Sequence, residues 1–527
     1  MRLLLLAGSL AVVGCAAGSG APGTPTPLSA LRPEDRVVIG DVATVQAIAS
    51  SQERVYVVHR EAIGIWRPLE RHWEVPRRTP PGISLVGTRA AIVDPLDQSV
   101  VIATATGWVR YSADIDRWDR GVLPSEAIGL AIDRTDPAGG VWIRTRSGWF
   151  QLSPLGAARP GAPPARLEPA PTLADAERDL PMLRSLAGTI ALGPGFTPGQ
   201  LTSAAPSPDR RGWFLGTSTA GLLFLDRFST IPERVGVGLP GESVAALALL
   251  PNGVWVATDP TPDGRPAGVT FLRDDLGSST ALATDRASGL PYGAPRALLP
   301  GDRVLWLGGD RGLLRLGIDD GRALTVGQGG GLPDQRILAL AQWRNEIVAG
   351  TMRGVVSIAA DGTTTWRTPS IGFAVRALAP RGDTLYVGTD RGVAALLPGD
   401  TALRVPEGYR LLPGGGVPVV AIGMQGDTLV AVQQDRIAWR DPVQGAWQNG
   451  SVVPAAIGAV RVAAFTDYGI WLAGDAGVAL MSPTLGVVRV LTVGADFPDR
   501  VTSVVADRRY LWVGTWRGLV RIALAGG

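Results

Sequence analysis

The sequence predicts an all-β fold built from about eleven copies of one four-stranded unit. Short apolar runs recur along the chain, for example LYVGTDRGVAAL at 385–396 and LWVGTWRGLVRI at 511–522. Each run is four to six residues long and rich in β-branched and aromatic residues, and Gly, Pro and Asp bound it, as is typical of strands joined by tight turns. The 69 Gly and 42 Pro are spread between these runs. Such a repeat is typical of a β-propeller, in which each blade is a small antiparallel sheet.

The spacing of the repeat fits one propeller blade per unit. Most steps between successive units are about 38 to 46 residues. Propellers usually have four to eight blades, so about eleven units favour two rings, one inserted into the other, over a single large ring. The residues that occupy the Trp position of LWVGT are Tyr56, Ile102, Trp142, Trp213, Trp255, Trp306, Val348, Tyr386, Val430, Trp471 and Trp512.

Two places depart from the regular period. The step from Trp142 to Trp213 is longer than the others and contains TLADAERDLPMLRSLA at 172–187, which predicts a short helical insertion. The stretch 259–266, DPTPDGRP, predicts an extended loop. We therefore expect divergent blades over 35–164, the insertion with a short helix over 165–200, and regular blades over 201–527.

The first strand of the chain is expected to close a ring. The last unit ends near Gly527 without an outermost strand, and RVVI at 36–39 precedes the first unit without a partner of its own. An open ring would leave two unpaired strand edges. We therefore expect residues 36–39 to pair with the last unit.

The N-terminus resembles a bacterial lipoprotein signal peptide. Arg2 is followed by an apolar core, and the small residues of VVGC lead to Cys15, the one cysteine of the chain. The resemblance implies cleavage after residue 14 and acylation of Cys15, which anchors the protein to a membrane. Ala16 stands where Asp would favour the inner membrane, so the resemblance implies the outer membrane. Residues 15–34 are rich in Gly, Pro and Thr and predict a flexible tether.

The repeat itself resembles the two-component regulator propeller repeat. That pattern has a Gly-Leu-Pro loop, an apolar strand, then Leu-Trp-Val-Gly-Thr and Gly-Leu. The match is strong over 239–527, with such loops at 238–240, 289–291 and 331–333, and weak over 35–160. The resemblance implies blades and specifies no ligand. Family members often carry a membrane-spanning helix and a kinase or regulator module; the sequence shows neither, so signalling would need a separate partner.

One position of the repeat suggests a binding site. In a propeller, turns between the second and third strands lie on the same face as the Gly-Leu-Pro loops, so arginines in these turns would share one rim. Such arginines can hold carboxylate or phosphate with two hydrogen bonds, and Trp516 can stack on a sugar or planar group. Alternatively, they only pair with carboxylates such as Asp310 and Asp390. The arginines directly before the turn Gly are Arg311, Arg353, Arg391 and Arg517.

Composition argues against several functions. His59 and His72 are the two histidines, and no Cys/His cluster has metal-binding spacing, so we expect no metal and no cofactor. The chain contains no Lys, its formal net charge is +3, and no run of like charges could follow a phosphate backbone. Nucleic acid is therefore not an expected partner.

The sequence thus predicts a non-catalytic, lipid-anchored propeller of the cell envelope. It is expected to bind a protein partner or an envelope or extracellular ligand, such as a glycan or an anionic ligand, in a sensor-like or scaffold role. The alternative is a propeller enzyme that acts on polysaccharide or a related polymer. That enzyme would need two carboxyl groups about 5 to 9.5 Å apart in a groove.

Overall fold

The computed structural model describes residues 36–524, except for 41–43, 81, 136–139, 154–155, 192–197, 236–238, 240, 261–267, 275, 277, 284–293, 327–330, 369–371, 401, 413–414 and 483–485. The predicted signal peptide 1–14, Cys15 and the tether 15–34 lie outside the described residues. So do the loop at 289–291 and most of the loop extension at 259–266. These predictions therefore stay predictions.

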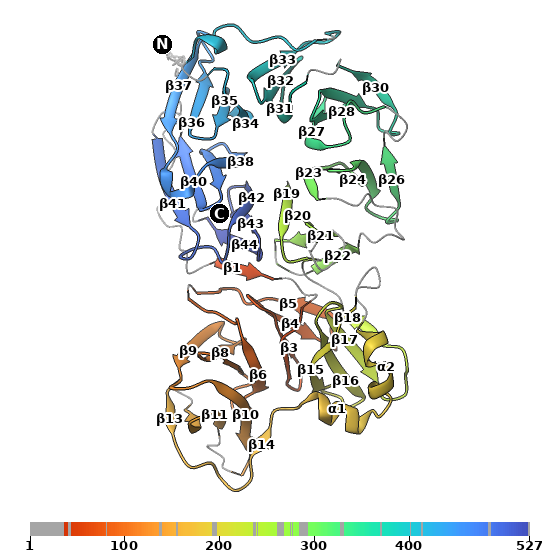
Figure 1. Cartoon of the computed structure of the whole chain (residues 1–527), viewed down its shortest axis with the longest axis vertical. Coiled ribbons are helices and arrows are strands. Elements are labelled where there is room, and N and C mark those ends of the chain that lie inside the picture. The colour runs from red at the N-terminus through yellow and green to blue at the C-terminus, as the bar shows by residue number, and fades with distance from the viewer. Residues whose placement is uncertain are drawn as a thin grey trace, which may run out of the picture.

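Seven antiparallel sheets form a closed ring, the upper body in Figure 1. Their strands are β1 (Arg36–Ile39), β19 (Val244–Leu250), β20 (Gly253–Thr258), β21 (Gly268–Arg273), β22 (Ser278–Ala283), β23 (Pro295–Pro300), β24 (Val304–Gly309), β25 (Gly312–Gly317), β26 (Ala323–Val326), β27 (Ile337–Trp343), β28 (Glu346–Thr351), β29 (Val355–Ile358), β30 (Thr364–Arg367), β31 (Val375–Arg381), β32 (Thr384–Thr389), β33 (Gly392–Leu396), β34 (Val419–Gln425), β35 (Thr428–Gln433), β36 (Arg436–Arg440), β37 (Trp447–Val452), β38 (Val460–Phe465), β39 (Ile470–Gly474), β40 (Gly477–Ser482), β41 (Gly486–Thr492), β42 (Val501–Ala506), β43 (Tyr510–Thr515) and β44 (Gly518–Ala523). The first strands of neighbouring blades pack together in the order β19, β23, β27, β31, β34, β38 and β42, and β42 packs back on β19.

Four further sheets form a second body, the lower one in Figure 1, which we call the four-blade unit. Its strands are β2 (Ala47–Ser50), β3 (Val55–Val58), β4 (Ile63–Arg67), β5 (His72–Glu74), β6 (Thr88–Val93), β7 (Val100–Thr104), β8 (Gly107–Ser112), β9 (Arg117–Val122), β10 (Ala127–Asp133), β11 (Gly140–Thr145), β12 (Gly148–Leu152), β13 (Ala158–Pro160), β14 (Glu168–Pro169), β15 (Leu201–Pro206), β16 (Gly212–Thr217), β17 (Leu222–Asp226) and β18 (Glu233–Val235). The first strands pack in the order β10, β6, β2 and β15, so the last blade in the chain lies beside the first.

The two bodies confirm the prediction of eleven blades with one body inserted into the other, but two rings were predicted, and in the described residues the first strands of the four-blade unit pack in a row from β10 to β15. The four-blade unit lies in the chain between β1 and β19 of the seven-blade ring. Strand β1 pairs antiparallel with β44, from Arg36 opposite Ile522 to Ile39 opposite Leu519, as expected for ring closure. Within the residues that the structure describes, two blades depart from four strands: β31–β33 has three, and β10–β14 has five.

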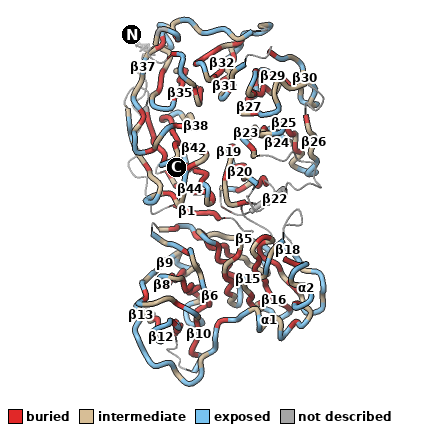
Figure 2. Tube along the Cα trace, viewed as in Figure 1, coloured by how far each residue is buried: buried red, intermediate tan, exposed pale blue. Residues whose placement is uncertain are grey.

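The core lies between facing blades, where Figure 2 shows buried residues along the strands. The Trp of the repeat is part of it, since Trp255, Trp471 and Trp512 are at most 2% exposed. In several blades a Gly follows two residues later and allows the next blade to approach: a Cβ at Gly388, two residues after Tyr386, would lie 2.9 Å from the Val419 side chain. The packing between blades therefore requires Gly at this position, whereas Ala257 and Ala473 stand there after Trp255 and Trp471.

Two helices occupy the predicted insertion, α1 (Leu173–Asp179) and α2 (Leu183–Ile190). Thr172 caps α1 in a capping box with Asp175. Buried residues of both helices pack against the β16–β17 sheet on the side opposite β2–β4. The helices thus cover the side of this blade on which a further blade would otherwise pack.

Candidate functional site

The Thr of the repeat fixes the turn that carries the candidate arginines. In the β32–β33 turn, Thr389 Oγ1 donates a hydrogen bond to the Gly392 carbonyl at 2.8 Å and accepts one from the Arg391 N–H at 3.1 Å. The same pair of bonds forms around Arg353 and around Arg517. Gly392 has φ of 108°, which favours glycine, so Gly-Thr and the turn Gly together define the turn.

The structure places three of the candidate arginines on one face of the seven-blade ring. Arg353 Nε lies 3.7 Å from Oδ2 of Asp334, which directly follows the Gly-Leu-Pro loop at 331–333. The Arg391 guanidinium lies 5.3 Å from the centre of the Phe373 ring, and Phe373 stands in the loop before the first strand β31. Arg311 is exposed in the corresponding turn. Turns and preceding loops therefore share a face, as the geometry of a propeller predicts.

Three further arginines on this face were not expected from the sequence. Each stands at a β-bulge one residue into a first strand, and each pairs with an Asp 14 residues later in the turn of its own blade. Arg296 pairs with Asp310 at 3.3 Å, and Arg461 with Asp475 at 2.7 Å. Arg376 pairs with Asp390. The signal that could have revealed them is the recurring Arg-to-Asp spacing of 14.

We call this surface the arginine face and define it by Arg296, Arg311, Arg336, Arg353, Arg376, Arg391 and Arg461. Its aspartates are already engaged. Asp334 contacts both Arg336 and Arg353. Burial raises the pKa of the Asp334 carboxyl, but the hydrogen bonds from Arg336 together with the charges of Arg336 and Arg353 outweigh burial and leave the pKa below its usual value. The aspartates of this face are thus shared among more numerous arginines.

The Thr hydroxyl gives a direct test of the turn. We expect Thr389→Val to lower the free energy of unfolding by about 1 to 2 kcal/mol, because it removes both hydrogen bonds of a buried hydroxyl without changing side-chain size. Urea unfolding measures the change. Thr389→Ser keeps the hydroxyl and should lose much less. Equal losses in the two variants would show that the methyl group, and not the hydroxyl, stabilises the turn.

Arg517 occupies the corresponding turn of the last blade, at the junction of the two bodies. Its Nε is 3.0 Å from Asp499 Oδ2, and its Nη1 is 3.6 Å from Glu61 Oε1 in the β3–β4 turn. Neighbouring Trp516 is 51% exposed, and the Arg500 guanidinium lies over its ring at 4.9 Å. Arg517 therefore joins the two bodies, while Trp516 stays accessible.

The junction contains a small cavity of about 70 Å³, lined by Gly40, Thr44, His59, Arg60, Glu61, Glu242 and Arg517. Arg60 Nη1 lies 3.6 Å from Glu242 Oε1. His59 is 3% exposed, and its Nδ1 lies 3.0 Å from the Thr44 carbonyl oxygen. Burial raises the pKa of the Glu61 carboxyl, and Arg517 and Arg60 oppose the shift without cancelling it.

The raised pKa of Glu61 makes the junction pH-dependent. The folded protein holds the Glu61 proton more tightly than the unfolded chain, so this group stabilises the fold at low pH and the stabilisation is lost as pH rises through the folded pKa. We expect Glu61→Gln to melt slightly above the unchanged protein at pH 7. The difference should shrink as the pH falls and Glu61 becomes protonated. Thermal melts at several pH values measure it, with exposed Glu70→Gln as control. A lower melting temperature for Glu61→Gln at pH 7 would contradict the expectation.

Across the described part of the chain, no three or more His, Cys, Asp or Glu side chains are grouped so that they could hold a metal ion. Among the helices of the same described residues, none has the length and apolar character needed to cross a membrane.

Comparison with known proteins gives weak likenesses. The chain matches no family model and no curated protein. The computationally designed Ika8 protein is 17% identical over 61% of this chain and 95% of its own, with a TM-score of 0.40. The extracellular domain of the putative one component system BT4673 from B. thetaiotaomicron is 13% identical over 92% of this chain and 70% of its own, with a TM-score of 0.39. The Neurospora crassa Pan2 WD40 domain is 14% identical over 54% and 89%, with a TM-score of 0.40. Likenesses this low assign neither a family nor a function.

Proposed function

We propose that this chain is a non-catalytic β-propeller of the cell envelope, held at a membrane through an acylated Cys15, that binds an anionic ligand at the arginine face. The role is sensor-like or that of a scaffold. An acidic polysaccharide is the ligand class that suits the site best, because repeated carboxylates can meet arginines that are repeated around a ring.

One observation carries the proposal. The alternative was that Asp310 and Asp390 neutralise the turn arginines that directly follow them. Instead these carboxylates pair with Arg296 and Arg376 from the first strands of the same blades. Arg311 and Arg391 remain exposed beside ion pairs that are already formed. Because the turn is preformed, its backbone loses little conformational freedom when the guanidinium binds a carboxylate, which favours ligand binding.

Binding to defined polymers tests the proposal. We expect the full chain to bind polygalacturonate and not neutral dextran. The combined change of Arg311, Arg353 and Arg391 to Gln should raise the Kd at least tenfold. The matched control changes Arg303, Arg344 and Arg508 to Gln. These three arginines are also more than half exposed, but they stand in turns between first and second strands, at the other end of the blades.

Comparison of the two variants distinguishes binding at the arginine face from attraction by the net charge of the protein. An equal loss in both variants would show that the net charge of the protein, and not the arginine face, attracts the polymer. Failure to bind any anionic polymer would contradict the proposal. The anchor is tested on its own: the unchanged protein should incorporate labelled palmitate, and Cys15→Ala should not.

A further inference from the structure

The four-blade unit carries exposed apolar side chains at the ends of its turns. Leu69, Ile115 and Phe228 stand in turns between third and fourth strands of three blades, and Ile231 closely follows Phe228. Leu96 stands in the β6–β7 turn. Their exposed fractions are 88% for Leu69, 49% for Leu96, 68% for Ile115, 97% for Phe228 and 78% for Ile231. We call the surface that these five residues define the tip face.

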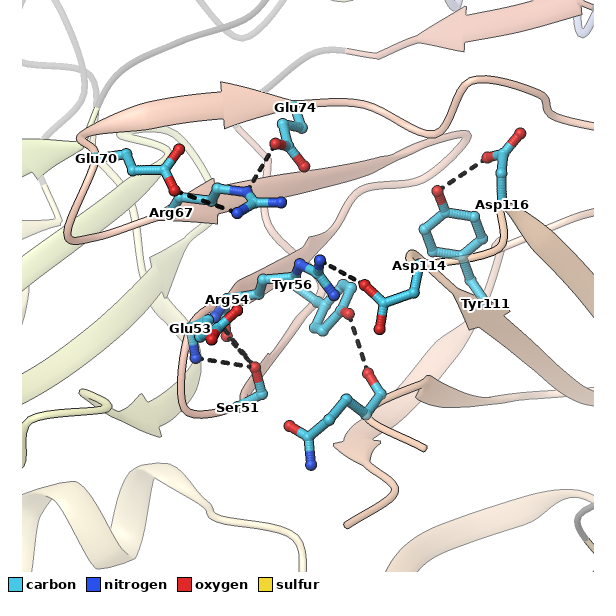
Figure 3. Close-up of polar contacts among 11 residues, drawn as sticks. Ser51, Glu53, Arg54, Tyr56, Arg67, Glu70, Glu74, Tyr111, Asp114 and Asp116 are labelled. Carbon is cyan, nitrogen blue, oxygen red and sulfur yellow. Dashed lines mark hydrogen bonds and ion pairs between the residues drawn. The ribbon is translucent and has the colours of Figure 1, made fainter. Parts of the chain in front are cut away.

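Contacts between the turns show that they belong to one face. Arg54, in the β2–β3 turn, lies 2.6 Å from Asp114, which precedes Ile115 (Figure 3). The Tyr56 hydroxyl donates to the Gln98 carbonyl at 3.0 Å, in the turn that contains Leu96. Arg71, two residues after Leu69, pairs with Glu233, at the start of β18. Three neighbouring blades are therefore tied together at this face.

Hydrogen bonds hold the apolar tips in place. The Tyr111 hydroxyl donates to Asp116 Oδ1 at 3.0 Å, directly after Ile115, as Figure 3 shows. The Phe228 N–H donates to Asp226 Oδ1 at 2.9 Å, and the Ile231 N–H donates to Ser229 Oγ at 3.1 Å. Turns that are fixed in this way present apolar side chains to solvent without a cost for ordering the backbone on binding.

We propose that the tip face rests on a lipid bilayer, into which Leu69, Ile115, Phe228 and Ile231 insert. The apolar residues stand on separate turns, which suits a fluid surface without a fixed shape better than the continuous pocket of a protein partner. Three arginines at the turns that join these blades are paired with carboxylates: Arg54 with Asp114, Arg67 with Glu74 at 2.7 Å, and Arg71 with Glu233. Binding is therefore driven by apolar insertion and needs no anionic lipid.

The position of the predicted lipid anchor favours a bilayer as the partner of the tip face. This part of the argument rests on the proposed function. The 21 peptide steps from Cys15 to Arg36 span at most about 75 Å when fully extended. Strand β1 begins at Arg36, and Arg36 Nε donates to the Thr79 carbonyl at 2.9 Å, which ties β1 to the segment that follows β5. An acylated Cys15 thus keeps the four-blade unit near the bilayer, where weak insertion contacts are effective.

Vesicle flotation of a chain that begins at Ala16 tests the tip face without the anchor. This chain keeps every residue that the structure describes. We expect it to float with phosphatidylethanolamine vesicles, with or without phosphatidylglycerol. The combined change of Leu69, Ile115, Phe228 and Ile231 to Ser should lower the bound fraction at least tenfold. Val122→Ser is the matched control, because Val122 is 85% exposed but stands at the other end of β9.

A second readout is independent of folding effects in the combined variant. The chain has one cysteine, Cys15, so Phe228→Cys becomes the one thiol of the chain that begins at Ala16. A polarity-sensitive fluorophore there should brighten when vesicles are added, and the same fluorophore at Val122→Cys should not. If the chain does not float and the label at position 228 does not respond, the proposal is wrong. A protein partner would then be the better explanation of the apolar residues of the tip face. Palmitate labelling of the unchanged protein and of Cys15→Ala is unaffected by that result, so the two proposals fail separately.

Discussion

Replacing Asp94 with Ala is expected to lower the free energy of unfolding by about 3 to 5 kcal/mol. Asp94 Oδ2 lies 2.9 Å from Arg110 Nη2, and the two side chains are 3% and 2% exposed. The pair lies between blades, where Arg110 Nη1 also donates to the Ser153 carbonyl at 3.3 Å. Removing the carboxylate leaves a guanidinium in the core without its compensating charge.

Burial raises the pKa of the Asp94 carboxyl, and Arg110 opposes this shift. The pair is thus costly to form as well as costly to break. Replacing both partners, as in Asp94→Leu with Arg110→Met, should restore most of the lost stability, because apolar residues of similar size need no compensation there. Urea unfolding measures all three proteins. A loss below about 1 kcal/mol for Asp94→Ala would contradict the importance of the pair.

The second large effect concerns closure of the seven-blade ring. Val37, in β1, is fully buried in a cluster with Trp512, Leu519 and Val254. We expect Val37→Asp to cost at least 3 to 5 kcal/mol, since it places an unpaired charge in this core. It also weakens pairing with β44, which would then become an exposed edge that promotes aggregation.

Val452→Asp provides the control for this prediction. Val452 is 70% exposed at the end of β37, so the same substitution should change stability by less than about 0.5 kcal/mol. Chemical unfolding and size-exclusion chromatography measure stability and aggregation. If Val37→Asp behaves like Val452→Asp, β1 does not close the ring in solution.

Much of the fold could be predicted because its signals are local. Strand length, the alternation around Trp512 and the turn Gly518 are set within about a dozen residues, and eleven copies imply two groups of blades. The division into seven and four blades could not be predicted, since it depends on which blade faces pack. The two helices that cover one side of β16 illustrate this. Their sequence predicts that they are helices, but only tertiary contacts show that they pack on the side of β16 from which Trp213 projects.

The candidate site was predictable only in part, for a similar reason. The position of Arg311 and Arg391, directly before the turn Gly, recurs in the sequence, so these candidates could be predicted from it. The partners of Asp310 and Asp390 were not, because a β-bulge turns the side chains of Arg296 and Arg376 toward the turn. Likewise, Arg517 shares the position before the turn Gly but contacts Glu61 from the other body, a contact that depends on how the two bodies meet.

The proposal of ligand binding at the arginine face is tested most directly by measuring the binding of polygalacturonate at increasing salt concentrations. Binding through several guanidinium groups should weaken steeply as salt screens them, and the Gln variant of Arg311, Arg353 and Arg391 should bind more weakly with a shallower dependence. The control variant of Arg303, Arg344 and Arg508 should follow the unchanged protein. Identical salt dependence in all three proteins, or no binding at low salt, would contradict the central claim that this face holds an anionic ligand.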